Sequence, residues 1–376
     1  MKFTDCIEIV GSKPTLYEGT KQYVSTGAVE EYFINEKSIE EYSYKERPSR
    51  ADLVGKSGDI LFAKMAETKK TLILDKETEN YLFSTGFFAI RPKNGILTTK
   101  CLYYLLNSKN FLNQKDKNSS GATQKAITNA GLEKINVNIP LFFKQDQIVK
   151  QFDLLTDIIK KYQSQLKKLD SLIKSRFIEM FGDPLDNQKN WEVQTLGNLC
   201  EIVRGGSPRP IDKFLGGSIP WIKIGDATNG DDIYLYKTKE HIIEEGIKKS
   251  RLIPEGSLIF ANCGVSLGFA RIIKFQGCIH DGWLAFQNIS PRVNNVFLLK
   301  SLNMCTDYFR KTAPDGTQPN LNTTIMKSFV QILPPKDLQD EYVQFVQQID
   351  KSKFAVQKSL EKAETLYKSL MQEYFG

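Results

Sequence analysis

The sequence has few of the residues that build metal centres, and it has no long apolar run. Its six cysteines, at positions 6, 101, 200, 263, 278 and 305, never form a Cys-x-x-Cys pair, and only His241 and His280 could join them as ligands. We therefore expect no metal site and six reduced, buried thiols, as in a cytoplasmic protein. No stretch approaches about 18 apolar residues, so we expect no membrane span. The first ten residues do not resemble a signal peptide.

Motifs for phosphate, dinucleotide and methyl-transfer chemistry are also missing. Gly55-Lys56-Ser57 resembles the end of a phosphate-binding loop, but Arg50 stands where that motif requires glycine. A His-based catalytic centre would be limited to His241, or to His280 with Asp281, and the repeat described below does not duplicate the His280 and Asp281 groups. We therefore favour a chain without catalytic residues or a cofactor of its own.

Charge and length leave several classes of protein open. Fifty-one Lys and Arg against 44 Asp and Glu give a net charge of +7, which permits a polyanionic partner without requiring one. A length of 376 residues with 41% hydrophobic residues favours two or three folded domains over one.

An internal repeat is the strongest signal in the sequence. Residues 123–182 align with 317–376 at a constant shift of 194 and without a gap, so that Pro140 matches Pro334 and Gly182 matches Gly376. Upstream, residues 58–63 align with 256–261 at a shift of 198. The chain therefore consists of two homologous halves, roughly 1–182 and 183–376.

The shared end of each half has the spacing of a coiled coil. Apolar residues recur alternately every four and three positions, and neither segment contains an internal Gly or Pro. We predict two long helices that pair in an antiparallel coiled coil, with Lys353 as the one polar interruption; an ordinary amphipathic core helix is the alternative. The predicted helix-pair interface comprises Ile148, Phe152, Leu155, Ile159, Tyr162, Leu166, Leu169, Ile349, Val356, Leu360, Ala363, Tyr367 and Leu370.

Outside the helices, short apolar runs broken by Gly, Pro and Asn predict strands, and two helical segments make each region mixed α and β. A turn-rich loop, 204–210, carries two arginines, whose guanidinium groups suit phosphates or guanine edges. A polar loop at the repeat junction carries Thr-Gln in both halves, and glutamine suits adenine. Solvated surface or capping roles are the alternatives for both loops. The DNA-binding candidates from these loops, and from positions that differ between the halves, are Arg204, Ser207, Arg209, Lys213, Lys223, Asn262, Arg271, Thr317, Gln318, Asn320, Lys64, Lys115, Lys117, Thr123, Gln124 and Lys125.

The order of these motifs resembles a known family. The segments 204–208, 219–226, 316–321 and 332–335, followed by the heptad helix, are similar to the target-recognition unit of type I restriction-modification specificity subunits. The first half departs from the pattern, because Val10-Gly11-Ser12-Lys13-Pro14 replaces the Gly-Gly-Ser-Pro loop and residues 183–193 have no counterpart.

The resemblance implies an α+β fold of two homologous target-recognition domains, 1–140 and 184–335. Two spacer helices, 141–183 and 336–376, would separate the domains and form the antiparallel coiled coil with pseudo-two-fold symmetry. Each domain would recognise one half of a split double-stranded DNA site, and the helices would fix the spacer between the halves.

The resemblance also implies partners and cofactors. Two methylase subunits would dock on the helices and carry S-adenosylmethionine, and a restriction subunit with ATP and Mg would join through the complex, without a membrane. A coiled-coil scaffold without DNA specificity and an uncharacterised enzyme with a dimerisation arm are the alternatives.

Overall fold

The computed structural model describes residues 1–228, 230, 232–264, 266–313 and 320–376. They form two compact units, each described below by itself. Unit 1 comprises Met1–Ser164 and Val356–Gly376, and unit 2 comprises Gln165–Ala355. Helices and strands occur in both units, so the predicted α+β fold is confirmed.

Unit 1 contains two main sheets. One is antiparallel, in the order β1-β9-β6-β7, and the other has the order β5-β2-β8, in which β2 and β8 are parallel. Its strands are β1 (Ile7–Val10), β2 (Thr20–Val24), β3 (Val29–Glu30), β4 (Phe33–Ile34), β5 (Glu40–Ser43), β6 (Ile60–Ala63), β7 (Thr71–Ile73), β8 (Leu82–Phe83) and β9 (Phe87–Pro92). Its short helices are α1 (Phe3–Cys6), η1 (Glu36–Ser38), η2 (Thr78–Asn80), α2 (Thr99–Leu106), α3 (Lys109–Lys117) and α4 (Asn129–Leu132).

Unit 2 repeats this plan with additions. Its main sheet has the order β11-β19-β16-β17-β13, and its second sheet has the order β14-β12-β18-β15. Its strands are β10 (Glu192–Thr195), β11 (Glu201–Arg204), β12 (Leu215–Ile222), β13 (Tyr234–Leu235), β14 (Glu240–Ile242), β15 (Arg251–Ile253), β16 (Leu258–Ala261), β17 (Ala270–Ile273), β18 (Gly277–Ile279), β19 (Trp283–Gln287) and β20 (Val330–Leu333). Its short helices are α6 (Leu196–Leu199), η3 (Ile211–Lys213), η4 (Ile224–Asp226), η5 (Glu244–Lys249), α7 (Asn295–Met304), α8 (Thr306–Thr312) and α9 (Thr323–Ser328).

The strand order explains the apolar runs found in the sequence. The run Ile60–Ala63 forms β6 and the run Leu258–Ala261 forms β16, and each strand lies in the interior of its sheet with all four residues buried. A strand covered on both faces needs apolar side chains at every position rather than at alternate ones. The repeat in sequence is therefore also a repeat in fold.

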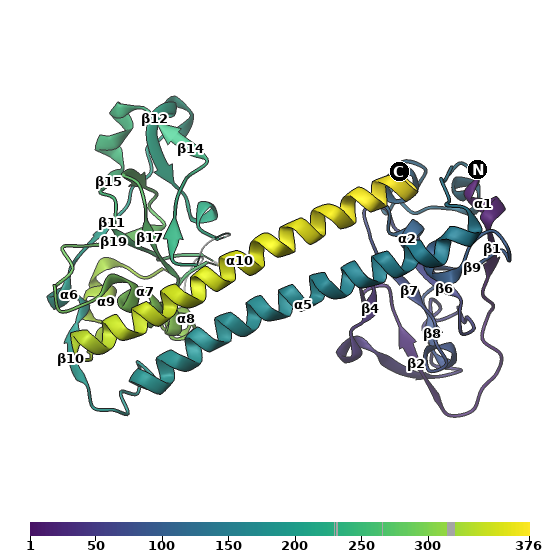
Figure 1. Cartoon of the computed structure of the whole chain (residues 1–376), viewed down its shortest axis with the longest axis horizontal. Coiled ribbons are helices and arrows are strands. Elements are labelled where there is room, and N and C mark those ends of the chain that lie inside the picture. Colours follow the sequence, from purple (N-terminus) through teal and green to yellow (C-terminus); the bar gives the residue numbers. More distant parts are fainter. Residues whose placement is uncertain (229, 231, 265, 314–319) are drawn as a thin grey trace. The chain divides into compact units, whose positions relative to one another are not determined.

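The two long helices are α5 (Phe142–Phe181) and α10 (Lys336–Phe375), 40 residues each (Figure 1). In unit 1 the ring of Phe152 lies 5.4 Å from that of Tyr367. In unit 2 the ring of Phe177 lies 5.4 Å from that of Tyr342. In each unit, therefore, an early segment of one helix packs against a late segment of the other, which is antiparallel packing.

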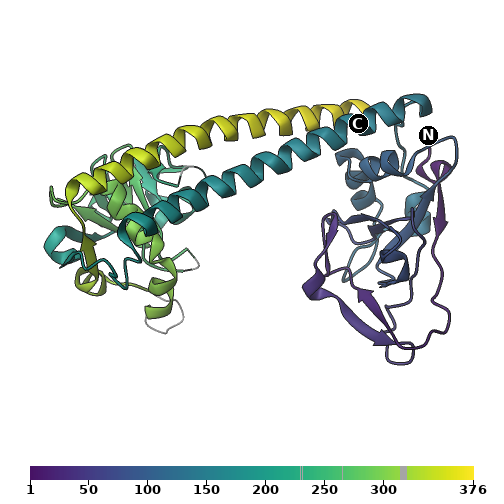
Figure 2. The ribbon, with the colours of Figure 1, turned by 60° about the horizontal axis from the view of Figure 1, so that its bottom comes forward.

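All thirteen predicted interface residues are shielded from solvent, but not all by the partner helix. Ile148, Phe152, Leu155, Val356, Leu360 and Ala363 are buried, and the other seven are half-buried. Phe152 also stacks on Tyr104 of α2, with ring centroids 4.8 Å apart, and belongs to the core of unit 1. Figure 2 shows α2 beneath this part of α5. The apolar stripe therefore joins the helices to the globular parts as well as to each other.

A buried glutamine fixes each long helix to its unit. Gln145 accepts a hydrogen bond from the backbone N–H of Thr98 (2.8 Å) and donates to the carbonyls of Ile96 and Pro140. Gln339 makes the same three bonds in unit 2, accepting from Asn294 N–H (2.8 Å). Both glutamines are 0% exposed. Thr98 and Asn294 are the N-caps of α2 and α7. Gln145 therefore joins the start of α5 to the start of α2, and Gln339 joins the start of α10 to the start of α7.

The structure places five of the six cysteines where the sequence predicts them, in the interior. The six cysteines are unpaired, and five are buried, whereas Cys263 is only half-buried. Within the described ranges, the side chains of His, Cys, Asp and Glu nowhere gather as a metal site. Over those same ranges, the helices lack the combined length and hydropathy that crossing a bilayer requires.

Candidate DNA interface

The arginine loop of unit 2 begins where β11 ends, and its two glycines are required by space. The N–H of Gly205 donates to the Trp283 carbonyl (2.9 Å) and that of Gly206 to the Ile279 carbonyl (3.0 Å). A Cβ at Gly205 would lie 2.1 Å from the backbone oxygen of His280. Only glycine permits this close approach, which places Arg204 and the following loop beside the start of β19.

His280 and Asp281 anchor this loop. Arg204 Nε donates to the Asp281 carbonyl (3.1 Å), and Ser207 Oγ donates to the Asp281 carboxylate (2.7 Å). His280 Nδ1 lies 3.0 Å from the Gly282 backbone nitrogen and 3.0 Å from the Asp281 carboxylate. Burial lowers the pKa of His280, against the opposing effect of Asp281. The pair that the sequence offered as a catalytic candidate holds the arginine loop in place.

Lys223 joins the same cluster from the end of β12. Its Nζ donates to Glu240 (2.6 Å) and lies 5.0 Å from the centre of the Trp221 ring, which is itself 5.6 Å from the His280 ring. Arg209 and Lys213 lie exposed in the loop and in η3. The structure thus brings Arg204, Ser207, Arg209 and Lys223 to one surface region.

Asn262 was predicted as a DNA contact, but it is 0% exposed. Its backbone N–H donates to Gly282 O (3.0 Å), and its side-chain amide donates to Asn320 Oδ1 (3.2 Å). Asn262 therefore positions Asn320 beside the end of β16. Because this side chain is buried, it does not contact a DNA base directly. Thr317 and Gln318 lie outside the described residues.

In unit 1, Lys64 stands at the scaffold position of Asn262. Its N–H donates to Gly86 O and its carbonyl accepts from Ile127 N–H, both at 2.8 Å. Lys64 Nζ donates to the Thr85 carbonyl (2.8 Å) and lies 4.5 Å from the Phe88 ring centre. Burial lowers the pKa of this ammonium group. The two units therefore present different side chains from the same framework.

The junction loop of unit 1 lies beside Lys64. A bridge between Met65 and Ala126 holds the loop, and Lys125 O accepts the Ala66 N–H (2.9 Å). The exposed DNA candidates in this part of unit 1 are Lys117, Thr123, Gln124 and Lys125.

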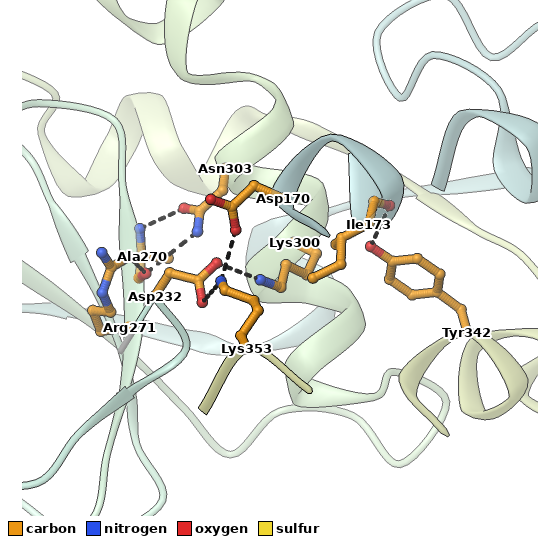
Figure 3. A network of polar contacts seen from close by, with 9 residues as sticks. All are labelled: Asp170, Ile173, Asp232, Ala270, Arg271, Lys300, Asn303, Tyr342 and Lys353. Carbon is orange, nitrogen blue, oxygen red and sulfur yellow. Dashed lines mark hydrogen bonds and ion pairs between the residues drawn. The ribbon is translucent and has the colours of Figure 1, made fainter. Parts of the chain in front are cut away.

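Lys115 is buried, contrary to the prediction of a DNA contact, whereas Arg271 is half-buried and its predicted DNA contact stays a prediction. Lys115 is 1% exposed, and its Nζ donates to the carbonyls of Met65 (2.7 Å) and Thr68 (2.8 Å), so it stabilises the loop before β7 and does not face solvent. Arg271 lies on β17 and donates to the Ala270 carbonyl (2.8 Å). Figure 3 shows Arg271 beside Ala270 and Asn303, next to the ion pairs of Asp232.

That polar network explains the interruption of the heptad stripe. Lys353 Nζ lies 2.7 Å from the Asp170 carboxylate and 3.2 Å from that of Asp232, and Lys300 Nζ lies 2.9 Å from Asp232 (Figure 3). Burial would raise the pKa of Asp232, but Lys300 and Lys353 together hold it well below its ordinary value. Sequence reasoning missed Asp232 and Lys300; a lysine in an apolar stripe was the available signal.

Comparison with known proteins identifies the class to which this architecture belongs. Residues 8–168 and 188–364 each match the type I restriction modification DNA specificity domain. The chain therefore belongs to the family of type I restriction-modification specificity subunits.

Two curated relatives cover most of the chain. It is 24% identical over 347 residues to the specificity subunit of the type I restriction enzyme MjaIX of Methanocaldococcus jannaschii, covering 86% of this chain and 76% of the relative. It is 22% identical over 402 residues to the HindI specificity subunit of Haemophilus influenzae, covering 84% and 85%.

Solved structures share the fold. A chain from a study of complex assembly in the type I restriction-modification system matches with a TM-score of 0.63 and 19% identity, covering 98% of this chain and 97% of that one. The specificity subunit from M. genitalium matches with a TM-score of 0.59 and 14% identity, covering 100% and 95%.

The role of the chain follows from this family. It supplies DNA sequence specificity to a type I restriction-modification complex, and it is a non-catalytic subunit that needs no cofactor of its own.

Proposed function

We propose that the two recognition regions, 1–140 and 184–335, each recognise one half of a bipartite double-stranded DNA site. The observation that carries this proposal is the difference between the units at equivalent positions. Lys64 replaces Asn262, and Ser84-Thr85 replaces His280-Asp281, on strands with the same order. Different side chains on one scaffold suit two different half-sites.

The arginine loop supplies the contacts of unit 2. Arg204 and Arg209 suit guanine edges or phosphates, and Lys213 and Lys223 suit phosphates. In unit 1 the corresponding contacts come from Lys64 and the exposed junction loop. The proposed DNA contacts are Arg204, Ser207, Arg209, Lys213, Lys223, Thr317, Gln318, Asn320, Lys64, Lys117, Thr123, Gln124 and Lys125.

The helices are proposed to dock two methylase subunits, which carry S-adenosylmethionine. A restriction subunit with ATP and Mg joins through that complex, in the cytoplasm where the DNA is. Exposed apolar side chains on the helices support a docking role. Leu154 on α5 is 62% exposed and Phe354 on α10 is 73% exposed.

The proposal is tested by mapping methylated adenines in a host genome that carries this chain with its neighbouring methylase gene. Exchange of residues 184–335 for the matching region of another specificity subunit should change one half of the mapped site. The matched control exchanges residues 1–140, which should change only the other half. A change in both halves after either exchange would contradict one domain per half-site.

A further inference from the structure

Unit 1 contains a cavity of about 610 Å³ between the β3–β4 hairpin, α2 and the long helices. All of its lining residues belong to unit 1. They include Lys69, Tyr103, Tyr104, Lys160, Tyr367 and Lys368.

The repeat shows what fills the equivalent place in unit 2. Alignment of α2 with α7 on the two buried glutamines makes Tyr104 equivalent to Lys300. The long helices make Ile159 equivalent to Lys353, and both Ile159 and Tyr104 line the cavity. In unit 2, Lys300 and Lys353 surround the Asp232 carboxylate (Figure 3). The chain itself thus occupies in unit 2 the place that is open in unit 1.

A difference in the path of the chain opens the cavity. In unit 2, β13 pairs with β17 as a fifth strand, and Asp232 lies just before β13. In unit 1, all of whose residues are described, the sheet ends at β7. There Glu31 O of the β3–β4 hairpin accepts the Thr71 N–H (2.7 Å), and the Glu31 carboxylate lies 3.6 Å from Lys69. The acidic side chain therefore pairs with Lys69, on the hairpin side of the cavity.

Tyr103, Tyr104 and Tyr367 line the cavity, and Tyr104 Oη donates to the Asp153 carboxylate (2.6 Å). Burial raises the pKa of Tyr103 and of Tyr367 to about 12, so both remain protonated at neutral pH. A surface of tyrosine rings suits a flat aromatic ring packed against it.

The ammonium groups of several lysines also line the cavity. Lys100 pairs with Asp153 (2.5 Å), and Lys160 lies 5.6 Å from the Tyr32 ring centre. No ion pair involves Lys160 or Lys368 in the described chain, although Asp157 and Glu364 also line the cavity. Lys160 and Lys368 are therefore available for an anionic group in the cavity.

From this arrangement we propose that the cavity of unit 1 binds a free nucleoside phosphate. The base lies against the tyrosines, and the phosphate lies at Lys160 and Lys368. The volume falls within the range of about 300–1,000 Å³ that small-molecule sites occupy. This site is additional to the DNA interface.

Calorimetric titration of the full-length chain tests the proposal. ATP, GTP and AMP are the probes, and adenosine and inorganic tripolyphosphate represent the two parts of the ligand. We expect saturable binding of at least one nucleotide at one site per chain, with adenosine and tripolyphosphate each at least tenfold weaker. Absence of saturable binding by all three nucleotides, or tripolyphosphate as tight as ATP, would overturn the proposal.

Charge variants separate this site from general attraction of anions. Lys160→Glu with Lys368→Glu should weaken nucleotide binding at least tenfold. Lys167→Glu with Lys362→Glu makes the same charge change on exposed positions of the same helices that do not line the cavity, and should change binding less than twofold. Equal losses in the two double variants would overturn the proposal.

A filling variant tests the cavity itself. Thr156→Trp places a large ring in the space, and nucleotide binding should be lost while helix content by circular dichroism is retained. Full nucleotide binding by folded Thr156→Trp protein would contradict the assignment. Competition by oligothymidylate at equal nucleotide concentration would assign the site to single-stranded DNA and overturn binding of a free nucleotide.

Discussion

Several buried polar side chains stabilise the fold by forming hydrogen bonds with backbone groups. Gln145, Gln339 and Lys115 are each at most 1% exposed, and each satisfies several backbone groups. A buried polar group of this kind contributes little net free energy when paired, but its removal leaves its partners unsatisfied. Such residues are therefore structural even when their chemical type suits DNA.

Replacing Gln339 by Met should lower the free energy of unfolding of unit 2 by about 2–4 kcal/mol. Methionine keeps the volume but leaves the Asn294 N–H and the carbonyls of Arg292 and Pro334 without partners. Thermal unfolding followed by circular dichroism measures the loss. The exposed neighbour Glu341→Gln is the control and should cost less than about 1 kcal/mol. Equal stability of Gln339→Met and the wild type would show that these bonds are dispensable.

Lys115 and Lys125 should respond in opposite ways to substitution. Lys115→Met leaves the carbonyls of Met65 and Thr68 unpaired and should cost about 1–3 kcal/mol of stability, with unchanged DNA affinity of the folded protein. Lys125→Met lies at an exposed loop position and should reduce DNA affinity and the slope of its salt dependence, with unchanged stability. Fluorescence anisotropy at several salt concentrations, together with thermal unfolding, measures both effects. Reversal of the two outcomes would contradict the placement of these lysines.

The same residues show how far sequence reasoning reaches. Residue type and position in the repeat were enough to select Arg204, Ser207 and Lys223, which the structure brings together. They were not enough to separate Lys125 from Lys115, because both have the same chemistry and only tertiary packing decides which is buried. Asn262 was also selected by residue type and position, and only the tertiary packing shows that its side chain is buried.

At the scale of elements, the ionic network between Lys353, Asp170, Asp232 and Lys300 connects α10 with α5, the chain before β13 and α7. The heptad pattern predicted both helices because an apolar stripe is a local property of the sequence. It could not predict β13, which has only two residues and pairs with a strand formed some 35 positions later. Asp232, the partner of Lys353 that lies just before β13, could therefore be identified only from the structure.

Acid should weaken this network. The pKa of Asp232 is depressed in the folded chain, so its contribution to stability is fully present above its unfolded pKa, about 3.9, and is lost as the pH falls through the lower folded value. The Asp232 side chain is 41% exposed, so solvent screening limits the contribution to about 1 kcal/mol.

Asp232→Asn removes this dependence. Its stability should be lower than that of the wild type at pH 7, and the difference should shrink as the pH falls below about 4. Chemical denaturation at a series of pH values measures it, with Asp186→Asn, an exposed carboxylate outside the network, as control. A difference that stays constant or grows towards low pH would contradict a depressed pKa at Asp232.

At the scale of the whole molecule, a duplicated framework carries two different sets of side chains. The repeat in the sequence established that two equivalent units exist, because their shared core and helices keep their spacing. It did not show where the units differ in path, as at β13 and the β3–β4 hairpin, because short strands leave little sequence signal. The proposed nucleotide site arises at such a difference in path, whereas the proposed DNA contacts differ by side chain on a shared framework.

Deleting one heptad from each long helix tests the proposed function of the helices as a spacer. Residues 161–167 and 355–361 are equivalent in the repeat, and removing seven residues keeps the apolar stripe in register. Each helix shortens by about 10 Å, which corresponds to roughly 3 base pairs of DNA. The mapped methylation site should therefore keep both half-sites and lose about 3 base pairs from its spacer.

Single deletions provide the control for this experiment. Removal of 161–167 alone mismatches the lengths of two helices that pack together, and should abolish specific methylation rather than shorten the spacer. An unchanged spacer in the double deletion, or altered half-site sequences, would refute the spacer role. The proposed DNA contacts lie in loops next to β16 and β19 and next to β6 and β9, which the deletions leave intact. A change in spacing alone would therefore isolate what the helices contribute.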